Sequence, residues 1–379
     1  MQFRDLKRQY NILKEPINKA VTEVMSSGAF VMGSKVEELE QSLAEYVGVK
    51  HCVSCANGTD SLYLALRALN IGEDDIVFVP DFTFFATAEA VSRVGAQPVF
   101  VDVDPNTFNI SPEKLEEEIS LWEETGDGCQ DLKAIITVDL FGQPADYIKI
   151  QEIAKRHGLV VIEDAAQGFG SRIGEQTACS FGTIGCTSFF PAKPLGCYGD
   201  GGALFTNDDS LANTCRSLRQ HGKGASKYSN EKIGLNSRLD AIQAAILQVK
   251  LSVFDQEIVA INHIAELYSK LLDDSLITIP LVQEGFHSSW AQYTIILPDE
   301  INREDLQTKL QEKEIPTQIY YPTPLHLLPA YHKYATWYKC PNSLSLCQHV
   351  LSLPIHPYLT EEEVNIVAET INKIIRSNG

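Results

Sequence analysis

Short apolar runs alternate with helical patterns through the first two thirds of the chain. The clearest strand-like runs are residues 74–80, 97–104, 132–140 and 158–166. Two segments have the spacing of amphipathic helices, residues 60–69 and residues 146–158, and Gly158 closes the second. Strands that alternate with helices in this way predict an α/β domain with a mostly parallel central sheet flanked by helices.

The pattern changes in the last third of the chain. A helical pattern runs from Ser237 to about Leu272, and shorter strand-like and helical segments follow it. We therefore expect two domains, a large α/β domain over residues 1–252 and a smaller C-terminal α+β domain over residues 253–379.

Composition narrows the class of protein and its partners. The chain has 379 residues, of which 44% are hydrophobic, so it can bury a sizeable core. A formal net charge of -19 opposes binding to nucleic acid or to an anionic membrane and favours a small partner. No apolar run is long enough to span a bilayer, and the first residues lack the apolar core of a signal peptide. A cytoplasmic protein is expected.

The cysteines do not form a metal-binding pattern. There are nine of them, and the only C-x-x-C pair, Cys52 and Cys55, has neither a second pair nor a histidine at ligand spacing. We expect structural roles for the cysteines and no bound metal.

The most unusual stretch surrounds Lys193. Pro191 and Pro194 flank the lysine, and a glycine cluster at residues 199–202 then precedes an apolar strand. A surface lysine needs no such framing, because proline fixes φ and glycine allows conformations that other residues avoid. The glycines miss the G-x-G-x-x-G spacing and precede a strand, which argues against a nicotinamide site. They are better explained as backbone that passes close to a group attached at Lys193.

Two further segments carry candidate binding groups. Asp164 follows a buried strand-like run and should emerge at the rim of the sheet close to Gln167, where ligands bind in open α/β sheets. Gly58 and Thr59 follow Asn57 at the start of a helix, whose free N–H groups favour an anion such as phosphate. Helix capping alone would also explain Asp164 and the Asn57 segment.

These groups together match the needs of pyridoxal phosphate. A lysine amine forms the Schiff base, a carboxylate keeps the pyridine nitrogen protonated, and an aromatic face stacks on the ring. The aromatic-rich stretch at residues 81–89 supplies such faces. We therefore predict pyridoxal phosphate as the cofactor.

The same motifs give the chain its likeness to a known family. It resembles the DegT/DnrJ/EryC1/StrS sugar-nucleotide aminotransferases, which have the aspartate-aminotransferase fold, also called fold type I of the pyridoxal phosphate enzymes. The likeness covers nearly the whole chain, and its motifs are residues 28–40, 56–62, 163–171, 188–202, 234–247, 320–326 and 351–360.

The resemblance implies roles around the cofactor ring. Lys193 would form the Schiff base and then move protons, and Asp164 would pair with the pyridinium nitrogen. Gln167 would contact the 3-hydroxyl side of the ring, and Phe84 would stack on it. The core motifs show no departure from the family. Phe84, where close relatives can carry tyrosine or histidine, keeps the stacking surface but lacks their polar group.

The resemblance also implies a shared phosphate site. Gly58, Thr59 and Ser188 would hold the phosphate from one chain, and Asn236 would reach it from the neighbouring subunit. This arrangement implies a homodimer in which each active site depends on both chains.

For the substrate, the resemblance is strongest to enzymes that aminate a 3-keto UDP-N-acetyl sugar. The expected reaction moves an amino group from L-glutamate to C3 of UDP-2-acetamido-2-deoxy-3-oxo-glucuronate, in bacterial surface polysaccharide synthesis. Arg238 is expected to pair with the uronate carboxylate. Tyr321 and His326 are further expected substrate contacts.

Several alternatives remain at this point. The substrate could instead be a neutral 3-keto or a 4-keto nucleotide sugar, and Arg238 could have a structural role. The basic stretch at residues 216–228 is either a solvated surface or a border of the substrate site. A regulatory protein that binds the cofactor without turnover is a further alternative, which the presence of Lys193 disfavours.

Overall fold

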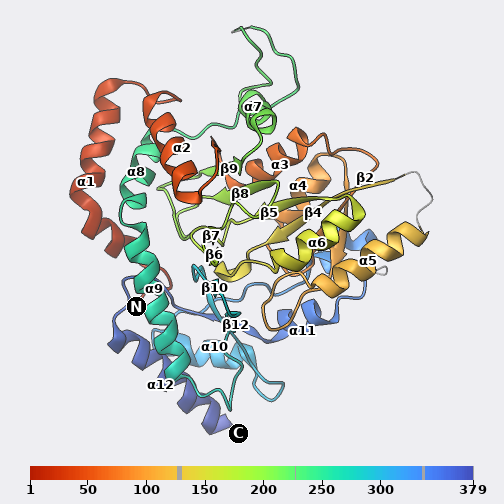
Figure 1. The fold of residues 1–379 in the computed structure, drawn as a ribbon. Coiled ribbons are helices and arrows are strands. Elements are labelled where there is room, and N and C mark those ends of the chain that lie inside the picture. The colour runs from red at the N-terminus through yellow and green to blue at the C-terminus, as the bar shows by residue number, and fades with distance from the viewer. Residues whose placement is uncertain (126–129, 227, 335–337, 379) are drawn as a thin grey trace.

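A seven-stranded sheet forms the centre of the computed structural model, which describes residues 1–125, 130–226, 228–334 and 338–378 (Figure 1). The strands follow the order β1-β9-β8-β5-β4-β2-β3. Their bounds are β1 His51–Cys55, β2 Asp75–Pro80, β3 Gln97–Val101, β4 Asp131–Val138, β5 Val160–Asp164, β8 Ile184–Ser188 and β9 Gly202–Thr206. β9 pairs antiparallel with β1 and β8, whereas the other neighbours pair in parallel. The expected mostly parallel sheet is confirmed.

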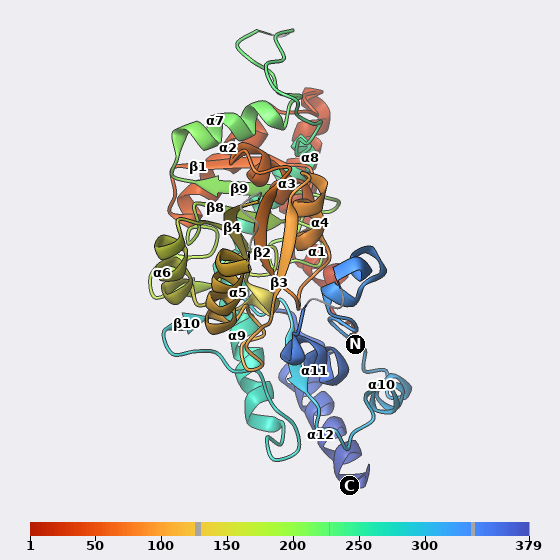
Figure 2. The ribbon, with the colours of Figure 1, turned by 90° about the vertical axis from the view of Figure 1, so that its right-hand side faces the viewer.

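Helices cover the sheet on both sides. Figure 2 shows α5 and α6 on one side of the strands and α4 on the other. The helices of this part are α1 Leu6–Ser27, α2 Ser34–Val47, α3 Gly58–Ala68, α4 Ala86–Arg93, α5 Pro112–Thr125, α6 Tyr147–His157, α7 Asp209–Leu218 and α8 Ala241–Leu251. As expected, Gly158 ends α6, and it does so with a left-handed φ of 67° that glycine adopts readily.

The long helical pattern after Ser237 is two helices rather than one. α8 ends at Leu251, and α9 spans Phe254–Leu271. At the break, the hydroxyl of Ser252 donates to the carbonyl oxygen of Val249 at 2.7 Å. A serine side chain that competes for backbone carbonyls in this way favours the end of a helix, a signal that apolar spacing does not contain.

The C-terminal part has its own core. Its elements are α9, β11 Tyr293–Ile296, α10 Arg303–Glu312, α11 Pro341–His349, β12 Val350–Leu353 and α12 Glu361–Asn378. β11 and β12 pair antiparallel, and one apolar cluster joins them to α9, α10 and α12. Leu325 and Tyr331 belong instead to the core of the sheet, so part of this region packs on the large domain. The boundary at residue 252 stays a prediction.

Short elements complete the fold. They are η1 Leu140–Gly142, η2 Leu325–Leu327, η3 Pro329–Tyr334 and the small antiparallel sheet of β6 Arg172–Ile173, β7 Gln176–Thr177 and β10 Phe286–His287. Among the described residues, none of the helices combines the length and the apolar character that a membrane span requires.

One segment projects away from the rest of the molecule. We call residues 219–240, between α7 and α8, the projecting segment; its tip extends beyond α7 in both views (Figures 1 and 2). Two of its large side chains are almost fully in solvent, Tyr228 at 85% exposure and Ile233 at 86%. Such apolar exposure on an extended segment favours contact with another surface.

Candidate active site

The carboxyl ends of neighbouring strands bring the first site residues together. Asp164 is the last residue of β5 and lies beside Cys186 of the parallel strand β8. Its carboxylate is buried and accepts hydrogen bonds from the Thr87 hydroxyl at 3.0 Å and the Ala166 amide at 3.2 Å. Burial raises the pKa of Asp164, while the two donors and the nearby Lys193 cation oppose that rise. The carboxylate is thus fixed in place at the rim of the sheet.

Lys193 lies in the turn that follows β8. Its amide donates to the carbonyl oxygen of Phe190 at 2.8 Å, which fixes the backbone between the flanking prolines. Burial lowers the pKa of the Lys193 amine to about 8; the Asp164 carboxylate opposes the shift and Arg4 adds to it. A large fraction of the amine is therefore neutral near pH 8, the form required of a nucleophile or a base.

The start of α3 lies against the end of β8. A Cβ atom built on Gly58 would lie 2.6 Å from the Cβ of Ser188, so only glycine permits this approach. Gly202 opposes Ser188 across the β8–β9 ladder, and a Cβ there would lie 2.5 Å from the Asn57 carbonyl oxygen. The Asn57 side chain caps the helix by accepting from the Asp60 amide at 2.8 Å. Gly58 and the half-buried Thr59 thus lie in the first turn of α3, next to Ser188.

An amide and two aromatic rings form another wall. The Gln167 side chain accepts from the Phe141 amide at 3.0 Å and donates to the Tyr321 hydroxyl at 3.1 Å. The rings of Tyr321 and Phe84 lie 6.3 Å apart at 38°, and Phe84 is 54% exposed. The exposed Phe84 ring is therefore open to a flat partner, as stacking requires.

His326 lies in a different environment from the one expected. It is buried in η2, and its Nδ1 lies 2.7 Å from Oδ2 of Asp81. Its backbone amide donates to the other oxygen of Asp81 at 2.9 Å. The side chain of the buried Cys340 lies close to those of Asp81 and His326. These contacts give His326 a structural role between the sheet and η2, and they lend no support to the expected substrate contact.

The projecting segment gathers the remaining candidates. Asn236 is exposed and forms an antiparallel bridge with Gln220. Arg238, His221, Lys223 and Lys232 line a pocket of about 830 Å³ on this segment. Neither Lys193 nor Asp164 is among the described residues that line it.

Arg219 differs from its neighbours in the basic stretch. It is buried and donates to Oε1 of Glu40 at 2.5 Å and to the carbonyl oxygen of Ser54 at 2.6 Å. Of the two interpretations left open for the basic stretch, neither describes Arg219, because its guanidinium is buried and joins α2 to β1. Lys227 lies outside the described residues, and Arg216 does not line the pocket.

Comparison with known proteins assigns the family. The model of the DegT/DnrJ/EryC1/StrS aminotransferase family matches residues 11–372. The chain belongs to this family. It is 43% identical over 371 residues to UDP-2-acetamido-2-deoxy-3-oxo-D-glucuronate aminotransferase of Pseudomonas aeruginosa, a match that covers 98% of this chain and 99% of the relative. It is also 44% identical to a pleiotropic regulatory protein of Geobacillus stearothermophilus, with 98% of both chains covered.

A solved structure agrees with the assignment. The crystal structure of NtdA from Bacillus subtilis with bound cofactor PMP has a TM-score of 0.89 and 30% sequence identity to this chain, and the match covers 99% of this chain and 85% of that one. This DegT/DnrJ/EryC1/StrS aminotransferase therefore has the expected fold and uses pyridoxal phosphate.

The residues of this aminotransferase fit that cofactor. The cradle between α3 and β8 leaves no room for a side chain at Gly58 and presents free helical N–H groups, which suit a phosphate. Asp164 is a buried carboxylate that a pyridinium would stabilise, and the Lys193 amine has a lowered pKa. The described part of one chain thus contains groups suited to the phosphate, the ring nitrogen and the covalent bond of the cofactor. The predicted contact of Asn236 would come from a second chain.

Sequence reasoning missed two residues around Lys193 and Asp164. Thr87, which donates to Asp164, lies one helical turn after Phe84 in the aromatic-rich stretch, so helical spacing could have indicated it. Arg4 donates to the carbonyl oxygen of Lys193 at 3.1 Å. No local signal marks Arg4, because the contact spans 189 positions of the sequence.

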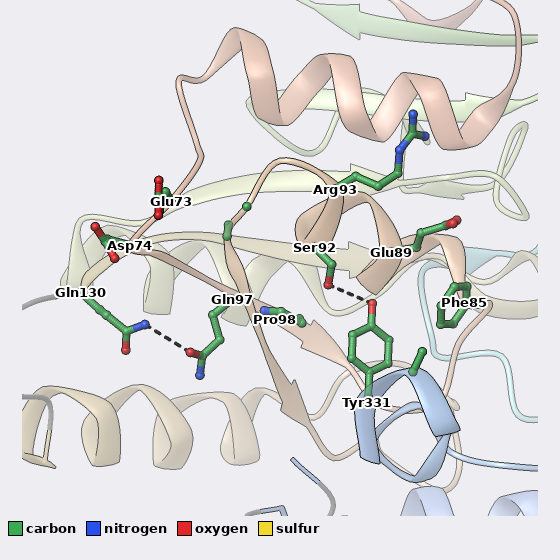
Figure 3. Close-up of a pocket in the computed structure, with 13 residues that line it drawn as sticks. Glu73, Asp74, Phe85, Glu89, Ser92, Arg93, Gln97, Pro98, Gln130 and Tyr331 are labelled. Atoms are coloured by element: carbon green, nitrogen blue, oxygen red, sulfur yellow. Dashed lines mark hydrogen bonds between the residues drawn. The ribbon is translucent and has the colours of Figure 1, made fainter. Parts of the chain in front are cut away.

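Two further features of this aminotransferase are its cysteines and a surface pocket. The eight cysteines of the described residues are free and buried, including Cys52 and Cys55. A surface pocket of about 550 Å³ contains Tyr331, which bonds to Ser92, together with Arg93 and the acidic Glu73, Asp74 and Glu89 (Figure 3). The predicted site residues are not among the described residues that line this pocket.

Proposed function

We propose that this aminotransferase moves an amino group from L-glutamate to C3 of a UDP-2-acetamido-2-deoxy-3-oxo-hexuronate. The observation that carries the reaction type is the Lys193 amine, with its lowered pKa, beside the buried Asp164 carboxylate. The curated name of the Pseudomonas aeruginosa relative supports the sugar and its position. The basic pocket that contains Arg238 supports an anionic substrate in a chain of net charge -19.

Each site residue is proposed to contribute one part of the amino transfer. Bound pyridoxal phosphate supplies the electron sink for the transfer. Lys193 would hold the cofactor, and its neutral amine would afterwards accept and return the proton that the transfer moves. Asp164 would stabilise a protonated ring nitrogen. Gln167, whose side chain is bonded to Tyr321, would contact the 3-hydroxyl side of the ring, and Phe84 would stack on it. Tyr321 would remain a substrate contact.

The proposed assembly is a homodimer with shared sites. The exposed Asn236 and the pocket-lining Arg238 belong to the projecting segment, whose exposed Ile233 suits burial against a second copy. Asn236 would then bind the phosphate group, and Arg238 the uronate carboxylate, in the partner's site. We place this reaction in the cytoplasm, in the synthesis of a bacterial surface polysaccharide such as O-antigen.

Two alternatives differ in testable ways. A neutral 3-keto or a 4-keto nucleotide sugar lacks the carboxylate that Arg238 would bind. A regulatory function, which the name of the Geobacillus stearothermophilus relative suggests for that protein, would not need an amine poised for proton transfer. Lys193, with its lowered pKa, favours the enzyme.

The role of Lys193 has a direct chemical test. Borohydride reduction of the cofactor-loaded protein should attach a pyridoxyl group to Lys193, identified by peptide mass. Lys193→Ala should lose both the label and turnover. A label on another lysine, or turnover by Lys193→Ala at the wild-type rate, would contradict the assignment.

The substrate is tested by comparing kcat/KM for the 3-keto uronate and its neutral counterpart. Arg238→Ala should lower the value for the uronate by about tenfold to a hundredfold and change that for the neutral sugar little. Arg216→Ala, which removes an arginine outside the basic pocket, is the matched control. A wild-type preference for a neutral or 4-keto sugar would overturn the substrate but not the aminotransferase.

A further inference from the structure

The N-terminal segment reaches the turn that carries Lys193. The N-terminus lies at the joint between the sheet and the C-terminal helices in both views (Figures 1 and 2). There Arg4 donates through Nη2 to the Lys193 carbonyl oxygen at 3.1 Å, and its Nη1 lies 3.5 Å from the carbonyl oxygen of Ala291. Arg4 and Lys193 both line a small cavity of about 20 Å³. Arg4 thus connects the lysine turn to the C-terminal part of the molecule.

The charge of Arg4 is not neutralised by an ion pair among the described residues. Glu257 is the carboxylate with the largest effect on it, but Glu257 already accepts from Gln9 at 2.9 Å and from the Tyr358 hydroxyl. Burial lowers the pKa of Arg4 to about 10, so the guanidinium still carries its charge at neutral pH. Its field therefore acts on groups that share the cavity.

We propose that Arg4 is a positioning residue for Lys193: it fixes the lysine turn through the carbonyl bond, and its charge favours the neutral form of the lysine amine. The inference rests on the proposed role of Lys193 as the residue that binds the cofactor and transfers the proton. Both tasks require a neutral amine, and a permanent cation close by makes a second cation costly.

The other charged and titratable groups around Lys193 act differently. Asp164, on β5, faces the amine and stabilises its cation. His356, in the segment after β12, is uncharged at neutral pH because burial lowers its pKa to about 4. Lys250, on α8, is buried and has a pKa lowered to about 8, whereas Glu257 and Tyr358 are bonded to each other. Arg4 is therefore a cation that keeps its charge across the range in which Lys193 titrates.

The test measures Lys193 directly in cofactor-free protein. Acetylation of Lys193 by acetic anhydride, followed by peptide mass spectrometry across pH 6 to 10, reports the fraction of neutral amine. Arg4→Gln and Arg4→Met should move the midpoint to higher pH and slow the reaction at pH 8 by about threefold, because the amine loses a repelling charge. Arg4→Lys, which keeps the charge, should restore the wild-type midpoint.

Arg8→Gln is the matched control. Arg8 belongs to the same N-terminal segment and donates to the Tyr358 carbonyl oxygen at 2.6 Å, yet it is not among the charges that shift the pKa of Lys193. Its variant should keep the wild-type profile. An unchanged midpoint in both neutral Arg4 variants, or an equal shift in Arg8→Gln, would overturn the proposal. The borohydride label tests the role of Lys193 separately, so failure of one claim is distinguishable from failure of the other.

Discussion

Asp139 and Asp164 are buried carboxyl groups at adjacent strand ends, and their surroundings give them different functions. Oδ1 of Asp139 accepts from the Tyr147 hydroxyl at 2.8 Å and the Ala145 amide at 3.2 Å, whereas its Oδ2 has no partner among the described residues. Burial and the Glu163 carboxylate raise the pKa of Asp139 well above its usual range. Asp139 is therefore suited to the protonated form, while Asp164 faces a cation.

This contrast predicts unequal effects of the same substitution. Asp164→Asn should lower kcat by about a hundredfold or more, because the ring nitrogen loses its charged partner. Asp139→Asn replaces a protonated carboxyl group with a group of the same shape and should stay within about threefold of wild type. Steady-state kinetics of both variants decides the matter, and similar losses in the two would show that Asp164 acts only through packing.

His356 predicts a pH dependence of stability. It is buried, its Nδ1 accepts from the Tyr358 amide at 3.2 Å, and burial lowers its pKa to about 4. The unfolded chain therefore binds a proton that the folded chain does not, and stability is lost as pH falls from about 6.5 towards 4.

His356→Asn should remove this dependence, since its Oδ1 can accept the same bond but does not titrate. Between pH 7 and 4, the free energy of unfolding of wild type should fall by roughly 2–3 kcal/mol more than that of the variant. Urea unfolding at several pH values measures the difference. Parallel curves for the two proteins would contradict the prediction.

At the level of elements, the sequence predicts the central strands well, but it does not predict their order in the sheet or where the long helical pattern breaks. Buried parallel strands such as β2 and β5 contain short continuous apolar runs, so spacing alone reveals them. Their order in the sheet and the break between α8 and α9 depend on tertiary contacts and side-chain bonds that spacing does not encode.

The same limit applies to the candidate site. Prolines, a strand end and a helix start mark Lys193, Asp164 and Gly58 locally as candidate site residues. Nothing local marks Arg4 or the structural partners of His326, since those contacts join residues 189 and 245 positions apart. Their chemistry depends on which distant segments the fold brings together.

The close approach of α3 to β8 gives a prediction about cofactor affinity. Gly58→Ala places a methyl group 2.6 Å from the Cβ of Ser188 and should push the helix start away, which should weaken cofactor binding by about tenfold or more. Gly72→Ala, whose methyl group would meet only the Val94 carbonyl oxygen at 3.5 Å, should bind normally. Titration of each cofactor-free variant with pyridoxal phosphate measures its affinity. Equal affinities of the two variants would contradict the proposal that the close approach of α3 to β8 shapes the phosphate site.

For the whole molecule, the decisive feature is the projecting segment. An acidic chain of net charge -19 places Arg238, Lys223 and Lys232 around one pocket on a segment that extends beyond its own α7. These cations outnumber the carboxylate of Glu231, which lines the same pocket, and would favour an anion there.

Shared sites predict complementation between two inactive variants. Lys193→Ala removes the amine, and Asn236→Asp places a negative charge against the phosphate group. In a mixed dimer one site would contain both defects and the other neither, so co-expression should recover up to about a quarter of wild-type activity. If each chain contained its own complete site, the mixed dimer would stay inactive. Two copies of the same variant, co-expressed, are the control.

The two halves of α9 belong to different cores. Phe254 packs with the sheet, whereas Ile261, Ile264 and Tyr268 pack in the C-terminal core. If one core melted, about half of an 18-residue helix would lose its packing, and a helical fragment that short is marginal in water. Melting of one core therefore removes support from the other through a shared helix. The thermal unfolding of the chain should accordingly be cooperative, with both cores lost in one transition rather than in two.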